Sequence, residues 1–147
     1  MMRRLDSGLS TVAGLLLLGL VDRVAAVDII RPRSLDFIEA RGGITVGVPE
    51  QANGGWRLPL GCDLSGVSSV NERGNVLHSG LAWWRSAAVI ENQRIYLTIE
   101  TNVQGMRASS ARCGPAELGY IGQGVYELHY RNPDGSTAKL GDVTITP

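Results

Sequence analysis

The sequence predicts an all-β domain, a small β-sandwich of about seven short strands, closed by one disulfide. Two observations carry this fold class. Segments in which apolar and polar residues alternate recur along the chain, and turn signals rich in Gly, Pro, Asn and Asp separate them every 8–12 residues or so. The chain has 147 residues, a length that fits a single domain.

Residues 1–26 have the three parts of a secretory signal. Arg3 and Arg4 form a basic start, residues 9–21 are almost entirely apolar, and Val24-Ala25-Ala26 places small residues before a cut after Ala26. The apolar stretch is shorter than the ~20 residues that span a bilayer, so an uncleaved anchor is the weaker alternative. We expect cleavage, no stable membrane insertion afterwards, and a domain of residues 27–147 in the periplasm or outside the cell.

The charge of that domain argues against some partners. Of the 14 basic and 14 acidic residues, three arginines and two aspartates lie in residues 1–26, which leaves 11 basic and 12 acidic residues. Nucleic acids and anionic membrane surfaces attract proteins with a basic excess. We therefore expect neither as the main partner.

Cys62 and Cys113 are the only cysteines of the chain. An even pair in a small exported domain predicts a disulfide. Neither cysteine has a Cys or His at the spacing of a zinc site, and neither belongs to a Cys-x-x-Cys motif. We expect the Cys62–Cys113 bond to hold the irregular residues 103–115 against the early strands.

The N-terminal half of the domain begins with an extended arm, residues 27–33, in which Pro32 limits helix formation. Residues 34–41 fit two structures. They form either a short helix between an N-cap at Ser34 and Gly42, or a strand of a hairpin around Gly42-Gly43. Beyond them we predict strands at residues 44–48, 56–60, 76–78 and 81–89, a loop at residues 49–55, and a turn at residues 71–75.

Two hairpins are the clearest elements. Residues 88–90 and 95–101 flank a turn at 91–93, and the alternation in the second segment predicts a half-buried strand. Near the C-terminus, residues 125–130 and 140–146 flank the turn Asn132-Pro133-Asp134-Gly135, in which Pro and Gly supply the required φ angles. The side chains expected to point inward are Ile95, Leu97, Ile99, Tyr126, Leu128, Tyr130, Val143 and Ile145.

The end of the chain resembles the last two strands of immunoglobulin-like and fibronectin type III-like domains. The resemblance is carried by Gly124-x-Tyr126 at the start of the penultimate strand and by the tight turn after it, and it covers residues 118–147. It implies an immunoglobulin-like sandwich in which the Tyr126 hydroxyl binds the preceding corner. Leu128 stands where antibody domains have a cysteine, so Cys62–Cys113 is not their inter-sheet bridge.

Motifs for catalysis are weak. His78 and His129 are the only histidines, no Gly-x-Ser-x-Gly motif is present, and the glycine-rich stretches lack the Gly-Lys-Ser/Thr of a phosphate loop. Glu91 with Glu100, or Glu117 with Glu127, would make acid–base pairs only in a cleft, and outward strand faces favour solvated charges. We expect no enzyme activity, no cofactor and no metal.

The aromatic residues suggest a binding surface instead. Trp, Tyr and Arg are enriched where interfaces gain most of their energy. Neighbours on a strand point to opposite faces, so one of Trp83 and Trp84 is expected in the core and the other outside. The alternative is ordinary packing, with an arginine stem over a tryptophan. The candidate partner-binding face contains Trp83, Trp84, Arg85, Arg94 and Tyr96.

From these patterns we expect an exported, non-enzymatic protein-binding module, such as an accessory subunit of an envelope assembly or an inhibitor or immunity-type protein. Two alternatives stay open: a carbohydrate- or ligand-binding module that uses an exposed tryptophan, and a small secreted hydrolase that uses His78 or His129. The arm at residues 27–33 could pair with the sheet edge of a neighbouring subunit, which would make the protein an oligomer.

Overall fold

A computed structural model describes residues 30–65, 67–70, 72–73, 76–78, 80–103 and 110–147 of the chain. The predicted signal, residues 1–26, and most of the turn predicted at residues 71–75 lie outside the described residues. In the described residues, no helix combines the length and apolar character needed to cross a membrane.

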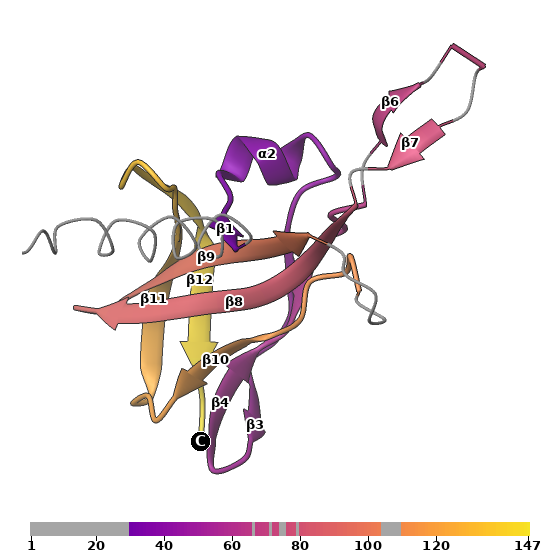
Figure 1. The fold of residues 1–147 in the computed structure, drawn as a ribbon. Helices are drawn as coiled ribbons and strands as arrows, with labels where there is room; N and C mark the ends of the chain where they lie inside the picture. The colour runs from indigo at the N-terminus through magenta and orange to yellow at the C-terminus, as the bar shows by residue number, and fades with distance from the viewer. Residues whose placement is uncertain (1–29, 66, 71, 74–75, 79, 104–109) are drawn as a thin grey trace, which may run out of the picture.

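The described chain is mostly strand, as the sequence predicts (Figure 1). Its one helix is α2 (Leu35–Glu39). The strands are β1 (Arg31–Pro32), β2 (Thr45–Val46), β3 (Glu50–Ala52), β4 (Gly55–Leu58), β5 (Leu60–Gly61), β6 (Val67–Val70), β7 (Val76–His78), β8 (Leu81–Glu91), β9 (Arg94–Val103), β10 (Ala116–Gly119), β11 (Gly124–Arg131) and β12 (Thr137–Ile145).

Eight strands form one curled, mixed sheet. Its order is β12-β11-β9-β8-β10-β4-β3, and β1 pairs with β9 beside this path. The β9–β11 and β8–β10 pairs are parallel, while the other neighbours are antiparallel. A seven-stranded sandwich is therefore not confirmed, because one hydrogen-bonded path joins strands that a sandwich would divide between two sheets.

The β8–β9 hairpin forms the centre of the sheet. Its turn is the pair Asn92 and Gln93, both at positive φ, which is the geometry of a two-residue hairpin loop. Ile95, Leu97 and Ile99 are fully buried, which confirms the predicted inward face of β9. This face packs against the remaining core rather than against solvent.

The β11–β12 hairpin also agrees with its prediction. The Gly135 N–H donates to the Asn132 carbonyl, 2.9 Å away, and Gly135 has φ +88°, as the turn requires. The Tyr126 hydroxyl donates to the Gly122 carbonyl at 2.8 Å, so this tyrosine does bind the preceding corner. The inward residues of both strands are buried, namely Tyr126, Leu128, Tyr130, Val143 and Ile145.

Residues 34–41 form the helix rather than the strand. The Ser34 hydroxyl accepts a hydrogen bond from the Phe37 N–H at 3.2 Å, which caps the first turn of α2. Before the helix, β1 pairs antiparallel with Glu100 and Thr101 of its own β9. The described part of the predicted arm therefore completes the sheet of its own chain, and residues 27–29 lie outside the described residues.

The prediction of a loop at residues 49–55 was wrong. Residues 50–52 form β3, which turns through Asn53 and Gly54 into β4. Asn-Gly at two positive φ angles favours such a hairpin, and the polar, glycine-rich composition concealed it. Of the other predicted strands, 44–48 shortens to β2, 56–60 divides into β4 and β5, and β7 pairs with β6 in a hairpin that extends away from the sheet (Figure 1).

The Cys62–Cys113 disulfide is present, as the sequence predicts. Around it, the Cys113 N–H donates to the Cys62 carbonyl at 3.0 Å, and Asp63 forms an isolated antiparallel bridge with Arg112. The Leu64 N–H reaches the Ala111 carbonyl at 2.8 Å. Residues 110–113 are thus joined to residues 62–64 by both a covalent bond and backbone hydrogen bonds.

Candidate functional site

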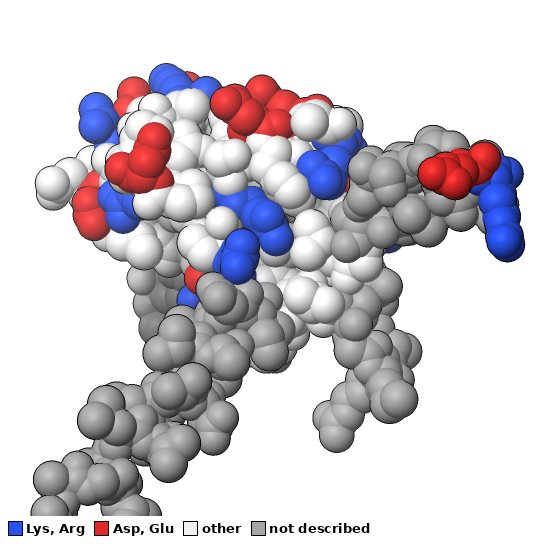
Figure 2. All heavy atoms as spheres, turned by 45° about the horizontal axis from the view of Figure 1, so that its top comes forward, with Lys and Arg blue, Asp and Glu red and all other residues white. Residues whose placement is uncertain are grey.

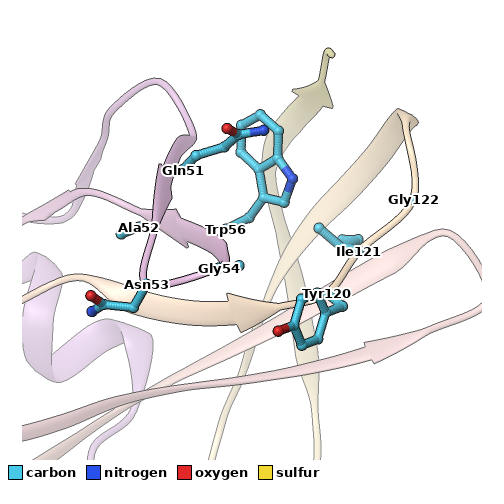
Figure 3. A pocket seen from close by; sticks show the side chains of 9 residues that line it. Gln51, Ala52, Asn53, Gly54, Trp56, Tyr120, Ile121 and Gly122 are labelled. Atoms are coloured by element: carbon cyan, nitrogen blue, oxygen red, sulfur yellow. The ribbon is translucent and has the colours of Figure 1, made fainter.

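An open hollow of about 520 Å³ lies where the β3–β4 turn faces the connection between β10 and β11 (Figure 3). We call it the aromatic hollow, because Trp56 and Tyr120 lie on two sides of it. Its lining consists of Gln51, Ala52, Asn53, Gly54, Gly55, Trp56, Tyr120, Ile121 and Gly122.

The first wall of the aromatic hollow is the β3–β4 hairpin. Ala52 pairs with Gly55, and the two residues between them have φ +52° and +77°, which is the left-handed geometry of a tight turn. Gln51 pairs with Trp56 across the hairpin, so the amide and the indole lie next to each other (Figure 3). The indole also packs against the hydrophobic core, which holds it in place.

The second wall is the connection from β10 to β11. Gly119, at φ +65°, pairs with Trp56 of β4 and turns the chain toward Tyr120. A Cβ on Gly55 would lie 3.0 Å from the Gly119 carbonyl oxygen, so only glycine lets the two walls approach this closely. The bond from Tyr126 to the Gly122 carbonyl fixes the far end of this connection.

Tyr120 is the most exposed large hydrophobic residue among the described residues, with 92 % of its surface accessible. Its hydroxyl lies on the Gly54 side of the aromatic hollow, since a Cβ on Gly54 would be 3.4 Å from it. Ile121, the next residue, packs instead against the core. The ring of Tyr120 is therefore presented to solvent by a connection that is anchored on both sides.

The lining has no carboxylate, ammonium, guanidinium, imidazole or thiol group. Its polar side-chain groups are the amides of Gln51 and Asn53, the phenol of Tyr120 and the indole N–H of Trp56. Within the described part of the chain, none of these four groups has a hydrogen-bonding partner. The aromatic hollow can thus offer flat apolar faces together with neutral hydrogen-bond donors and acceptors.

Three residues of the face predicted from sequence share one side of the sheet, with Arg85 toward one end of the β8–β9 ladder and Arg94 and Tyr96 toward the other. Arg85, Arg94 and Tyr96 are on the outward side of the β8–β9 ladder, opposite the buried face of β9. Arg85 makes two hydrogen bonds of 3.0 Å to Glu100, and Arg94 lies 3.0 Å from Glu127. Tyr96 is itself partly covered, because the Arg131 guanidinium is 4.1 Å from its ring centroid.

Ion pairs cross the rest of this outward face. Lys139 lies 3.4 Å from Glu127 and 3.2 Å from Asp142. Hydrogen bonds from His129 and Lys139 hold the pKa of Glu127 below its ordinary value. Basic and acidic side chains are similarly interspersed over the surface that Figure 2 shows. The charges of the β8–β9–β11–β12 face are thus largely satisfied within the chain.

The two adjacent tryptophans occupy a β-bulge. The register of β8 against β9 shifts between Trp83 and Arg85, so Trp84 is the extra residue and is 50 % exposed. Trp83 is half-buried, and its Nε1 donates to the Ser86 hydroxyl at 2.9 Å. Gly114 lies directly against the Trp83 ring, where a Cβ would come within 2.5 Å of it. Trp83 is therefore a packing residue, and Trp84 is the exposed one.

Of the two histidines, His129 is the one whose side chain the structure describes. His129 Nε2 is 3.1 Å from Glu127, and its ring lies beside that of Tyr96, with the centroids 5.7 Å apart. The side chain of His78 lies outside what the structure describes. Among the described residues, no group of three His, Cys, Asp or Glu side chains is arranged to hold a metal ion.

Sequence reasoning missed the residues of the aromatic hollow. Trp56 and Tyr120 are more than sixty positions apart in the chain, and nothing in the local sequence pattern places them together, because only the β4–β10 pairing brings them close. One signal was available. Asn53-Gly54 predicts a hairpin turn, which would have located the first wall.

In comparisons with known proteins, no family model, curated protein or solved structure matches the chain.

Proposed function

We propose that this chain is an exported, non-enzymatic binding module that takes its ligand in the aromatic hollow. The observation that carries the proposal is Tyr120, a large aromatic side chain 92 % exposed beside a second aromatic residue in a concave, uncharged site. An exposed ring costs free energy in water, and concave sites with aromatic walls and a few polar groups are typical of ligand binding.

The compartment of this module is outside the cytoplasm, either the periplasm or the surrounding medium. Two features support this location. The Cys62–Cys113 disulfide is of the kind that persists in oxidising compartments, and residues 1–26 have the pattern of a secretory signal. Detection of a mature chain that begins at Val27, by mass spectrometry of the secreted or periplasmic fraction, would support both the location and the cleavage after Ala26. A chain that retains residues 1–26 would contradict it.

The test of the binding site compares two exposed aromatic residues. The purified, disulfide-bonded protein is immobilised and exposed to an extract of the cell envelope of its host, and the retained material is measured. We expect Tyr120→Ala to lose most of the retained material and Trp84→Ala to keep it. Equal thermal unfolding midpoints would show that both variants are folded. Retention by Tyr120→Ala at the wild-type level would refute the proposal.

A second candidate is a protein-binding face around Trp84, as expected for an accessory subunit or an inhibitor. It is favoured by one observation, the exposure of Trp84 in a bulge next to Arg85. Tryptophan and arginine are common in the centres of protein interfaces. The same assay separates the two candidates, because here Trp84→Ala would lose the retained material and Tyr120→Ala would keep it.

A further inference from the structure

We propose that the ligand of the aromatic hollow is a neutral saccharide unit of a glycan, stacked against Tyr120 and Trp56. This inference rests on the proposed function and adds the chemical class of the ligand. It follows from three properties of the site, namely its neutral lining, its two aromatic faces and the rigidity of its walls.

The neutral lining selects against charged ligands. Cationic side chains favour anions and carboxylates favour cations, and the described lining has neither kind of side chain. The nearest charged neighbours along the hairpin, Glu50 and Arg57, already pair with each other at 2.6 Å. A ligand with no net charge and many hydroxyl groups therefore fits the aromatic hollow better than an ionic one.

The aromatic faces match one side of a sugar ring. A pyranose has C–H groups on its faces and hydroxyl groups around its edge, so it packs its faces on flat aromatic rings while its edge needs hydrogen bonds. Tyr120 and Trp56 supply rings with an apolar body and a polar tip. Gln51 and Asn53 supply amides, each of which can donate and accept hydrogen bonds. Neither amide has a hydrogen-bonding partner among the described residues.

The rigid walls reduce the entropic cost of binding. The tight turn at Asn53-Gly54, the close approach of Gly55 to Gly119 and the hydrogen bond from Tyr126 to Gly122 each fix backbone that carries the lining. A site that is already ordered loses less conformational freedom when it binds. Because the aromatic hollow is open rather than enclosed (Figure 3), it can also admit an internal unit of a longer chain.

The first experiment asks which kind of molecule is retained from the envelope extract. One portion of extract is treated with proteinase and another with periodate, which cleaves the vicinal diols of sugars. We expect the Tyr120-dependent retention to survive proteinase and to disappear after periodate. If the Tyr120-dependent retention were instead lost with proteinase and survived periodate, the saccharide proposal would be refuted and the ligand of the aromatic hollow would be a protein. That outcome is distinct from failure of the proposed function, which requires retention to be independent of Tyr120.

The second experiment measures affinity with defined probes. Isothermal titration and tryptophan fluorescence are recorded with chitotriose, cellotriose and maltotriose, and with trigalacturonic acid as the charged control. We expect a neutral trisaccharide to bind, with affinity about tenfold weaker in Tyr120→Ala and within about threefold of wild type in Tyr120→Phe, which keeps the ring. Trp84→Ala is the control that should bind as wild type. Absence of binding by all three neutral trisaccharides at about 10 mM, or preference for the charged one, would overturn the proposal.

Discussion

Tyr130 is the residue whose removal gives the most informative test of the fold. Its side chain is fully buried, and its hydroxyl joins two segments that are distant in sequence. It donates to the Arg33 carbonyl at 2.6 Å and accepts from the Ile99 N–H at 3.1 Å. Tyr130→Phe deletes one oxygen atom and leaves both backbone groups without this partner. We expect a loss of about 1–3 kcal/mol in the free energy of unfolding at pH 7.

The same hydroxyl gives this loss a pH dependence. Burial raises the pKa of Tyr130 from 10.0 to about 12, because the ionised phenolate would lose its hydration. In the unfolded chain the pKa is near 10, so the stabilising contribution of the protonated hydroxyl is complete below pH 10 or so and is lost as the pH rises toward 12. At pH 11 the wild type should have lost about 1.4 kcal/mol that Tyr130→Phe, which cannot ionise, does not lose.

The assay is urea unfolding followed by tryptophan fluorescence, for both proteins, at several pH values between 8 and 11. The difference in stability between wild type and Tyr130→Phe should narrow by about 1.4 kcal/mol over this range. Tyr120→Phe is the matched control, because its exposed hydroxyl bonds to no described residue, and its stability at pH 8 should stay within about 0.5 kcal/mol of wild type. A wild-type-to-Tyr130→Phe difference that does not change with pH would refute the reasoning.

Three further substitutions test other parts of the sheet by the same unfolding measurement. Gly114→Ala should destabilise by about 1–3 kcal/mol, because the new methyl group would overlap the stiff ring of Trp83, and an unchanged midpoint would contradict this packing. Replacing Cys62 and Cys113 with serine should cost about 4 kcal/mol, since the bond closes a 51-residue separation, and a loss below about 1 kcal/mol would contradict the chain-entropy account. Gln93→Gly should stabilise the fold by about 0.5–1 kcal/mol, because Gln93 has φ +66°, a left-handed conformation that glycine adopts without steric cost. A destabilised variant would show that contacts of the Gln93 side chain contribute more to stability than relief of this backbone strain.

Alternation of residue types predicted the buried faces well, for a simple reason. A strand with one buried face must place an apolar residue at every second position. The alternation alone therefore identifies Ile95, Leu97 and Ile99 as the buried residues of β9, and they are fully buried. The same rule separated Trp83 from Trp84, although the structure achieves the separation through a bulge that alternation does not contain. A tight turn can likewise be predicted from its own residues, as the turn from Asn132 to Gly135 shows.

Strand pairing could not be predicted in the same way. The parallel pairing of β9 with β11 joins residues that are about thirty positions apart, and no residue in either strand specifies its partner by type. This pairing, with that of β8 and β10, is what turns the expected sandwich into one curled sheet. The aromatic hollow depends on such a pairing too, because Trp56 and Tyr120 become neighbours only when β4 lies beside β10.

The side chains of the β8–β9 face pair with each other, whereas Tyr120 of the aromatic hollow has no partner within the described chain. Substitutions on the two surfaces should therefore affect ligand binding and unfolding differently. On the β8–β9 face, Arg94 already satisfies Glu127, so a partner would first have to break ion pairs. Arg94→Ala should therefore leave the unfolding midpoint nearly unchanged, because an exposed ion pair contributes little to stability, and it should leave retention of the ligand unaffected. Tyr120 contributes its ring to solvent instead of to the core. Tyr120→Ala should thus weaken binding about tenfold while the unfolding midpoint stays the same. A variant that lost both binding and stability would show that Tyr120 supports the fold rather than the binding site.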